Sequence, residues 1–196
     1  HDVIDYDPPA ARTLSQAIAQ VPGMVFEAHS TDYQTRAAQA ALVRDHFAIL
    51  KVGPGLTFAL REALWALDAI EREWIEPTHQ AGLREVVIAR MRAHPAHWQR
   101  YYHGDGHALT VDLHYSLSDR MRYYWPDPEI EGARQRLFDN LRADPPPISL
   151  ISQYLPHALH ALRNGDATVD PLSLTIAHIN AVLDDYHDAC HPHDAH

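Results

Sequence analysis

Two short apolar runs, about twenty residues apart, constrain the fold of this chain most strongly. The segments MVFEA, residues 24–28, and HFAILKV, residues 46–52, show no regular polar alternation. Strands of this kind are typical of a parallel sheet whose two faces are both covered. Helical patterns flank and separate the two runs, at residues 8–20, 35–45 and 57–75. The order helix, strand, helix, strand, helix predicts βα units around a parallel sheet.

The segment after the second run has the clearest helical pattern. Its apolar residues recur at helical spacing; they are Leu60, Ala63, Leu64, Leu67, Ile70 and Trp74. Charged residues lie elsewhere on the circumference; they are Arg61, Glu62, Asp68, Glu71 and Arg72. Thr57 is placed to cap the N-terminus. The pattern predicts an amphipathic helix.

The character of the chain changes after the segment EPTH, residues 76–79. From Gly82 onward only helices are predicted, at residues 83–98, around 118–125, and at 128–141, 149–163 and 171–189. Proline-rich hinges such as RADPPPI separate them.

Charge and composition exclude two classes of partner. With 196 residues, of which 46% are hydrophobic, the chain can bury a core in one or at most two domains. Its formal net charge of −10 repels nucleic acid, and no run of Lys or Arg offsets this repulsion. No apolar run approaches the roughly 20 residues of a membrane span, and the single Cys190 cannot form an internal disulfide. We expect a cytoplasmic protein that binds neither nucleic acid nor membranes.

Polar residues gather where both predicted strands end. Glu27, His29, Ser30, Thr31 and Asp32 lie at the end of the first strand, and Lys51, Gly53 and Gly55 lie at the end of the second. The carboxyl ends of parallel strands carry function because their loops converge on one crevice. Glycines let backbone N–H groups approach a ligand, and the N-terminus of the following helix is partly positive. We predict that a phosphorylated polyol or sugar binds Glu27, Ser30, Thr31, Asp32, Lys51, Gly53 and Gly55. The alternative is a polar strand end that is satisfied by its own loop.

Two residues of this set have further chemical possibilities. Lys51 is the only lysine, so an amine can be required there that a guanidinium cannot replace. His29 is a candidate zinc ligand, although no second ligand lies at a diagnostic spacing, and a structural hydrogen bond is the alternative. The segment KVGPGLT places its lysine before the glycines, whereas a P-loop places it after them. A P-loop kinase is therefore unsupported.

A third cluster is the segment YSLSDRMRYYW, residues 115–125. Arginines lie among aromatic residues beside an acid; the members of interest are Asp119, Arg120, Arg122, Tyr123 and Trp125. Arginine that stacks on aromatic rings and pairs with an acid usually forms a structural knot or a subunit interface. We favour this role over the alternative, in which a guanidinium binds phosphate.

Several long blocks of the sequence resemble one known family. VFEAHSTDYQ, DHFAILKVGPGLTFALREALWAL, YYHG, YSLSDRMRYYW and LISQYLP together resemble the non-catalytic subunit of class II D-tagatose-1,6-bisphosphate aldolase. The matches to this family run from about Val3 to Cys190, essentially the whole chain. Proteins of that family are longer, so the chain resembles their C-terminal half. Some carry the label tagatose-6-phosphate kinase, which the missing P-loop pattern does not support.

The resemblance implies an α/β fold, with the C-terminal part of a (β/α)8 TIM barrel in residues 1–78 and a mostly helical extension in residues 79–196. It implies an accessory subunit that supports the activity and stability of a zinc-dependent catalytic aldolase subunit in sugar-phosphate catabolism and requires no cofactor itself. A half barrel has an unpaired strand edge, which predicts an obligate partner, poor solubility, or upstream strands outside the given sequence.

The resemblance also implies a distant relationship to the catalytic class II aldolases. In those enzymes, a zinc-binding histidine lies at the end of a late barrel strand, and a glycine-rich phosphate loop follows it. His29 occupies the histidine's place, but STDYQ replaces the glycines, and Gly53 replaces an asparagine of the final strand. These departures argue against independent aldol cleavage and leave sugar-phosphate binding open. Two alternatives stay open as well. One is a stand-alone sugar-phosphate enzyme that uses zinc at His29 and Glu27 or a Schiff base at Lys51. The other is an interaction module whose strand ends bind nothing.

Overall fold

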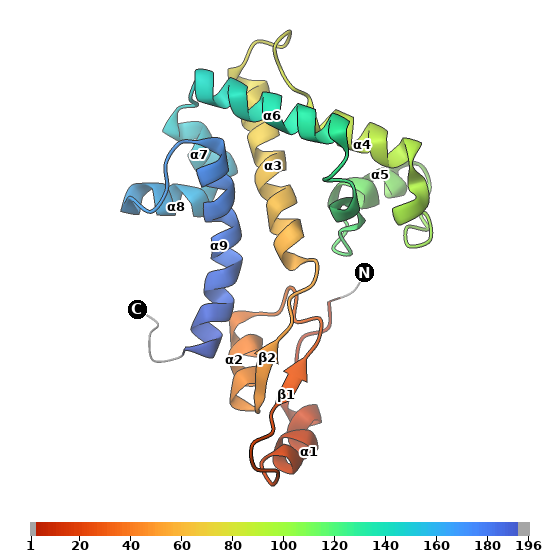
Figure 1. Ribbon diagram of the computed structural model, residues 1–196, viewed down its shortest axis with the longest axis vertical. Helices are drawn as coiled ribbons and strands as arrows, with labels where there is room; N and C mark the ends of the chain where they lie inside the picture. The colour runs from red at the N-terminus through yellow and green to blue at the C-terminus, as the bar shows by residue number, and fades with distance from the viewer. Residues whose placement is uncertain (1–2, 192–196) are drawn as a thin grey trace. The chain divides into compact units, whose positions relative to one another are not determined.

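The computed structural model describes residues 3–191 (Figure 1). Its elements are α1 (Pro8–Ile18), β1 (Phe26–Ala28), α2 (Arg36–Arg44), β2 (Phe47–Leu50), α3 (Gly55–Trp74), α4 (Leu83–Ala93), η1 (Pro95–His97), α5 (Gly106–Tyr115), η2 (Arg120–Tyr123), α6 (Pro128–Ala143), α7 (Ile148–Tyr154), α8 (Pro156–Asn164) and α9 (Pro171–Cys190). The first five confirm the predicted order, and the fold is α/β with mostly helices. No helix within residues 3–191 is both long and apolar enough to cross a membrane.

The described chain divides into two compact units. The first comprises residues 3–56 and 180–191 and contains both strands; we call it the strand unit. The second comprises Thr57–Ile179 and is helical; we call it the helical unit.

A two-stranded parallel sheet organises the strand unit. Phe26 of β1 is paired with Phe47 of β2, and their rings lie 5.2 Å apart between centroids. Helix α2 connects the strands, and it begins where the Thr35 side chain accepts a hydrogen bond from the N–H of Ala38. This β–α–β order is what parallel pairing requires, because a short turn cannot join two parallel strands.

The strands of this sheet are shorter and more exposed than the apolar runs predict. Their lengths are three and four residues. Met24 and Val25 precede β1 and are 61% and 53% exposed, and Ile49 of β2 is 48% exposed. The expected cover on both faces is therefore not supplied by the described residues of the strand unit.

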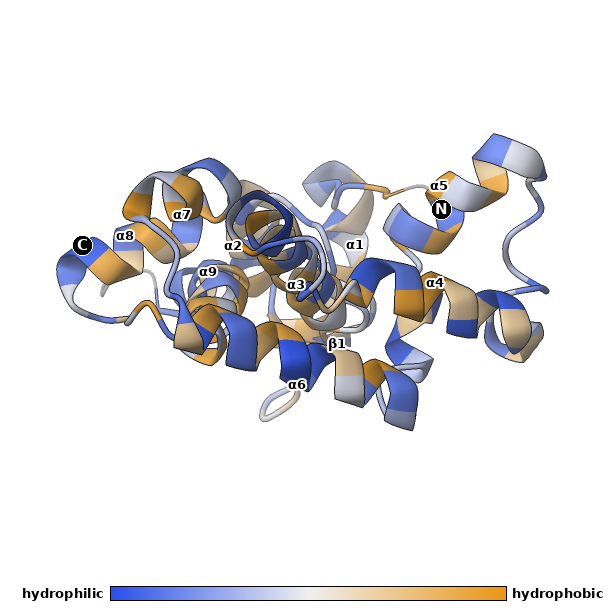
Figure 2. Cartoon of the chain, turned by 90° about the horizontal axis from the view of Figure 1, so that it is seen from above, coloured by the Kyte–Doolittle hydropathy of each residue, from blue (hydrophilic) through white to orange (hydrophobic). Residues whose placement is uncertain are grey.

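The helical unit has a closed apolar core. On α3, the predicted stripe is buried at Ala63, Leu64, Leu67 and Ile70, whereas Trp74 at the C-terminal end is 41% exposed. Helix α4 packs against α6. Orange and blue bands alternate along α6 in Figure 2. Its buried apolar positions are Ile130, Ala133, Leu137, Phe138 and Leu141, at the spacing of one helix face.

Prolines account for two differences between predicted and observed helices. The helix predicted at residues 83–98 ends at Ala93, because His94 precedes Pro95 and adopts an extended φ of −127°. The helix predicted at residues 149–163 is two helices, α7 and α8, separated at Leu155, which precedes Pro156. Helix α5 was not predicted, since Leu113 is its only fully buried residue and its apolar periodicity is weak.

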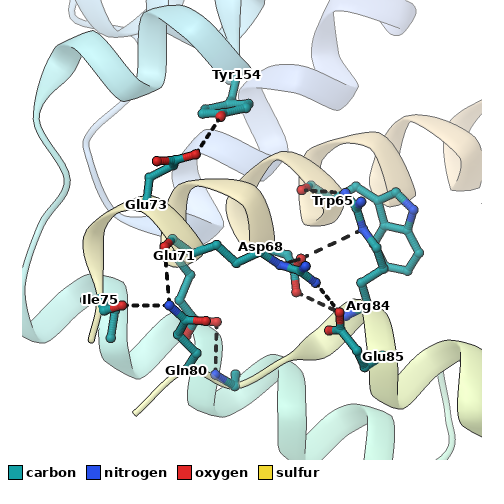
Figure 3. Close-up of polar contacts among 11 residues, drawn as sticks. Trp65, Asp68, Glu71, Glu73, Ile75, Gln80, Arg84, Glu85 and Tyr154 are labelled. Atoms are coloured by element: carbon teal, nitrogen blue, oxygen red, sulfur yellow. Dashed lines mark hydrogen bonds and ion pairs between the residues drawn. The ribbon is translucent and has the colours of Figure 1, made fainter. Parts of the chain in front are cut away.

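Three charged residues of α3 are buried, although the amphipathic pattern is typical of exposed charges; they are Arg61, Asp68 and Glu71. Asp68 accepts hydrogen bonds from Nε of Arg72 at 2.9 Å and from the N–H of Arg84 at 3.1 Å (Figure 3). Glu71 accepts one from the N–H of Ala81 at 3.0 Å. Both acids are tolerated in the interior because donors surround them.

Candidate functional site

The loops that follow β1 and β2 are joined by backbone hydrogen bonds. The N–H of Lys51 donates to the carbonyl of Ala28 at 2.8 Å, and the N–H of Thr31 donates to the carbonyl of Lys51 at 3.2 Å. The hydroxyl of Thr31 donates to the same carbonyl at 3.1 Å. The two strand ends therefore lie side by side, as parallel pairing predicts.

Glu27 lies between the two basic side chains of this site. One carboxylate oxygen, Oε1, is 2.8 Å from Nζ of Lys51 and 2.6 Å from Nε2 of His29. The hydrogen bond from Lys51 is the main cause that lowers the pKa of Glu27, and the bond from His29 lowers it further. The side chains of Lys51 and His29 are 51% and 69% exposed. The trio is therefore open to solvent and to ligands.

Asp32 contacts the backbone of the glycine segment. Its Oδ1 accepts hydrogen bonds from the N–H of Gly53 at 2.8 Å and from the N–H of Gly55 at 2.7 Å. Its Oδ2 lies 3.0 Å from the N–H of Gly53. Asp32 is only 8% exposed. The two amides that the sequence offers to a phosphate thus donate to a carboxylate of the chain itself.

A tyrosine from the C-terminal helix completes the strand ends and was not predicted. The hydroxyl of Tyr186, on α9, donates to the carbonyl of Thr31 at 2.8 Å and lies 3.0 Å from the hydroxyl of Thr31. Burial raises the pKa of Tyr186. Arg36 of α2 pairs with Asp185 at 2.9 Å and also with Asp188, so α2 and α9 are connected by charge. No local signal could have found Tyr186, because 155 residues separate it from Thr31.

The structure brings the predicted strand-end residues into two adjoining groups. In the first group, Glu27 contacts Lys51 and His29, and the carbonyl of Lys51 accepts a hydrogen bond from Thr31. Asp32 connects Gly53 and Gly55. Ser30 lies between His29 and Thr31 in sequence and is exposed, with a left-handed φ of 57°.

Zinc is the metal that the family resemblance implies for the catalytic relatives, and His29 and Glu27 are the candidate ligands. Zinc sites use at least three protein ligands. His29 and Glu27 supply two and contact each other. Within residues 3–191, no group of three or more His, Cys, Asp or Glu side chains could hold a metal ion. The residues that the structure describes therefore do not fit a zinc site.

The arginine–aromatic cluster belongs to the helical unit and has a buried part at Asp119. This residue has a left-handed φ of 44° and is fully buried. Its carboxylate accepts hydrogen bonds from the hydroxyl of Thr57 and from Nη1 of Arg61, the latter at 3.1 Å. Burial raises the pKa of Asp119, and the Thr57 hydrogen bond and the Arg61 charge offset this rise only in part. Trp125 packs edge-on to Trp65, with 6.2 Å between centroids.

The exposed part of the cluster is a stack of rings and guanidinium groups. The guanidinium of Arg120 lies 3.7 Å from the ring centroid of Tyr101 and 4.6 Å from that of Tyr123. Arg122 lies on Tyr123 at 4.6 Å. Nε of Arg120 donates to the carbonyl of His97 at 2.7 Å. Tyr101 and Tyr123 remain 55% and 43% exposed, and an interface role for this stack stays a prediction.

Comparisons with known proteins cover nearly the whole chain. A family model described as D-tagatose-1,6-bisphosphate aldolase subunit GatZ/KbaZ-like matches residues 1–191, which confirms the resemblance of the sequence blocks. A crystal structure from Sinorhizobium meliloti 1021, described as a probable tagatose 6 phosphate kinase, is similar with a TM-score of 0.91 and 48% sequence identity. The match covers 97% of this chain and 49% of the other, so this chain spans about half the length of that one.

Proposed function

We propose a function from one premise: the chain belongs to the D-tagatose-1,6-bisphosphate aldolase subunit GatZ/KbaZ-like family. We infer that the protein is an accessory, non-catalytic subunit of a class II tagatose-1,6-bisphosphate aldolase. It supports the activity and stability of a separate catalytic subunit in sugar-phosphate catabolism. The family match over residues 1–191 is the observation that carries this proposal.

The geometry of the strand ends supports the accessory role. A Schiff-base aldolase needs a free lysine amine as its nucleophile, and a metal-dependent aldolase needs imidazole and carboxylate groups that are directed at the metal. Here Glu27 contacts both Lys51 and His29 within 2.8 Å. The amine of Lys51 and the imidazole of His29 are therefore directed at the carboxylate of Glu27 rather than at a substrate or a metal.

We propose further that residues 1–78 form the last βα units of a TIM barrel and that residues 79–196 form a helical extension. The parallel β1–α2–β2 unit is the repeating element of such a barrel. Neighbouring strands would cover the exposed side chains of Met24, Val25 and Ile49. The similar crystal structure has a chain about twice as long, which leaves room for the other barrel strands.

The strand ends are proposed to bind a sugar phosphate without cleaving it. Glu27 offers a hydrogen-bond acceptor for sugar hydroxyls, and Lys51 and Ser30 offer exposed donors. Thr31, Asp32, Gly53 and Gly55 shape the floor beneath them through the hydrogen bonds described above. Through a ligand bound there, the accessory subunit would respond to the presence of substrate.

The direct test is cleavage of tagatose 1,6-bisphosphate by the catalytic subunit, measured with this protein, without it, and with this protein alone. We expect a higher rate or a longer active lifetime only in the mixture. Serum albumin at the same concentration controls for generic stabilisation. Turnover by this protein alone, or a mixture that behaves like the albumin control, would refute the accessory role.

A stand-alone sugar-phosphate enzyme is the second candidate, favoured by the chain's single lysine at the end of a strand beside a carboxylate. Borohydride reduction in the presence of substrate would trap a Schiff base at Lys51 as a permanent mass increase, and Lys51→Arg is the control. The accessory proposal expects no such adduct. Turnover that a chelator abolishes would instead support the zinc-dependent version.

A further inference from the structure

The N–H groups of Gly53 and Gly55 converge on one point at the start of α3. Two convergent backbone N–H groups at a helix N-terminus favour an anion, because the N–H groups point at it and the helix dipole adds positive potential. In this chain the anion is present: the Asp32 carboxylate accepts from both N–H groups at 2.7–3.0 Å. Asp32 is also more than nine-tenths buried.

The two glycines leave space for the carboxylate that lies against them. A Cβ atom at Gly53 would lie 2.8 Å from Oδ2 of Asp32, and one at Gly55 would lie 2.9 Å from Oδ1. Real Cβ atoms essentially never approach another atom so closely. The backbone of this segment is therefore fitted to the Asp32 side chain, and the glycines need not be explained by an external phosphate.

We propose that Asp32 is a built-in anion that excludes phosphate from the glycine N–H groups. A phosphate would have to displace a carboxylate that is tethered beside its donors, and the tether gives that carboxylate a high effective concentration. If Asp32 stayed in place, the two negative charges would repel each other at contact distance. This inference deepens the proposed function: a sugar phosphate at the strand ends is held through its hydroxyls and the exposed Lys51, not through Gly53 and Gly55.

The test is to remove the internal anion and to offer an external one. Asp32→Ala removes the carboxylate and leaves space for a small oxyanion. Amide NMR signals of Gly53 and Gly55 are followed while inorganic phosphate, or formate as the excised carboxylate, is added at constant ionic strength. We expect these signals to shift in Asp32→Ala with an affinity at least about tenfold higher than in the unchanged protein. The thermal midpoint of the variant should rise with phosphate as well.

Two further variants keep the result interpretable. Asp5→Ala removes one charge from an exposed position of the same unit, and it should show no phosphate response at the glycines. Asp32→Asn keeps the side-chain shape, so it replaces Asp32→Ala as the test variant if Asp32→Ala does not fold. It should accelerate hydrogen exchange at the Gly55 amide by at least about threefold, because a neutral acceptor holds the N–H less tightly.

Three results would overturn the inference. They are equal phosphate binding at these glycines in the unchanged protein, a folded Asp32→Ala that shows no response to either oxyanion, and unchanged Gly55 exchange in Asp32→Asn. None of these measurements uses the catalytic subunit or a sugar. A failed inference therefore leaves the aldolase mixing experiment unaffected, and a failed mixing experiment leaves this one unaffected.

Discussion

The strand unit and the helical unit bury their apolar residues to very different extents. Leu67, Ile70 and Leu83 of the helical unit are completely buried, whereas Met24 and Ile49 of the strand unit are 61% and 48% exposed. A helix satisfies its own backbone and needs only neighbours for one stripe of side chains. A parallel strand needs other strands at its edges and cover on both faces. Within residues 3–191, the helical unit therefore completes its core, whereas apolar side chains of the strand unit stay exposed.

The largest expected effect is the loss of stability when the carboxylate of Asp119 is removed, and its size reports how completely the helical unit excludes water. Asp119→Ala leaves the guanidinium of Arg61, which is 1% exposed, without its carboxylate. Breaking a buried ion pair in this way costs about 3–5 kcal/mol of unfolding free energy. Urea unfolding followed by tryptophan fluorescence measures it, since all four tryptophans lie in the helical unit.

The matched control is Glu131→Ala, which breaks the pair between Glu131 and Arg134 on the surface of α6. Because the Glu131 side chain is 53% exposed, this change should cost about 0.5 kcal/mol or less. Equal losses in the two variants would show that water reaches Asp119, and the contrast between the two units would then be weaker than we describe.

The second prediction compares the two units directly, by the same kind of truncation in each. Leu67→Ala should cost about 2–5 kcal/mol, because it removes fully buried methyl groups and leaves a cavity. Ile49→Ala should cost less than about 1 kcal/mol, because half of its side chain is already in water. Urea unfolding followed by circular dichroism measures both. A loss at Ile49 as large as that at Leu67 would mean that another surface covers β2 in solution.

The same contrast explains how much of the fold could be predicted. The apolar runs at residues 24–28 and 46–52 and the helical patterns beside them are local, so the order of the first five elements followed from them. Helix α5 escaped prediction because it buries only Leu113 completely. The burial of Asp68 and Glu71 depends on donors from Arg84 and Ala81, which a helical pattern does not contain.

That the strand-end residues lie near one another was predictable, whereas their individual contacts were not. Parallel pairing brings the residues after β1 beside those after β2, so Asp32 and Gly53 were expected to be neighbours. That Asp32 accepts from the glycine N–H groups depends on the loop backbone, which composition does not fix. Tyr186 reaches Thr31 only through the tertiary fold of the strand unit.

A smaller effect is expected at the exposed arginine–aromatic stack of the helical unit. Arg120→Lys keeps the charge but loses the planar contacts with Tyr101 and Tyr123 and the hydrogen bond from Nε. We expect a loss of about 1 kcal/mol in urea unfolding. Arg100→Lys, at an exposed position, is the control and should change stability by less than about 0.5 kcal/mol. If both substitutions behave alike, the stack does not contribute to stability, and an interface role becomes its remaining explanation.

The smallest expected effects are opposite pH dependences of one carboxyl from each unit. Burial raises the pKa of Asp119 above its ordinary value of 3.8. The stability that its protonated form contributes is fully present below that ordinary value and is lost as pH rises through the folded pKa. The hydrogen bond from Lys51 lowers the pKa of Glu27 below its ordinary value of 4.5. Its contribution is present above that value and is lost as pH falls through the folded pKa.

Thermal midpoints of Asp119→Asn and Glu27→Gln, each compared with the unchanged protein at about pH 3 to 6, separate these two behaviours. As pH rises, the unchanged protein should lose stability relative to Asp119→Asn and gain stability relative to Glu27→Gln. Both differences are expected because burial dominates in the closed helical unit, whereas solvent-exposed partners dominate at the open strand ends. If the difference in thermal midpoint changed with pH in the same direction for both variants, the two carboxyls would have similar environments. The contrast in burial between the two units would then not extend to the pKa shifts of these carboxyls.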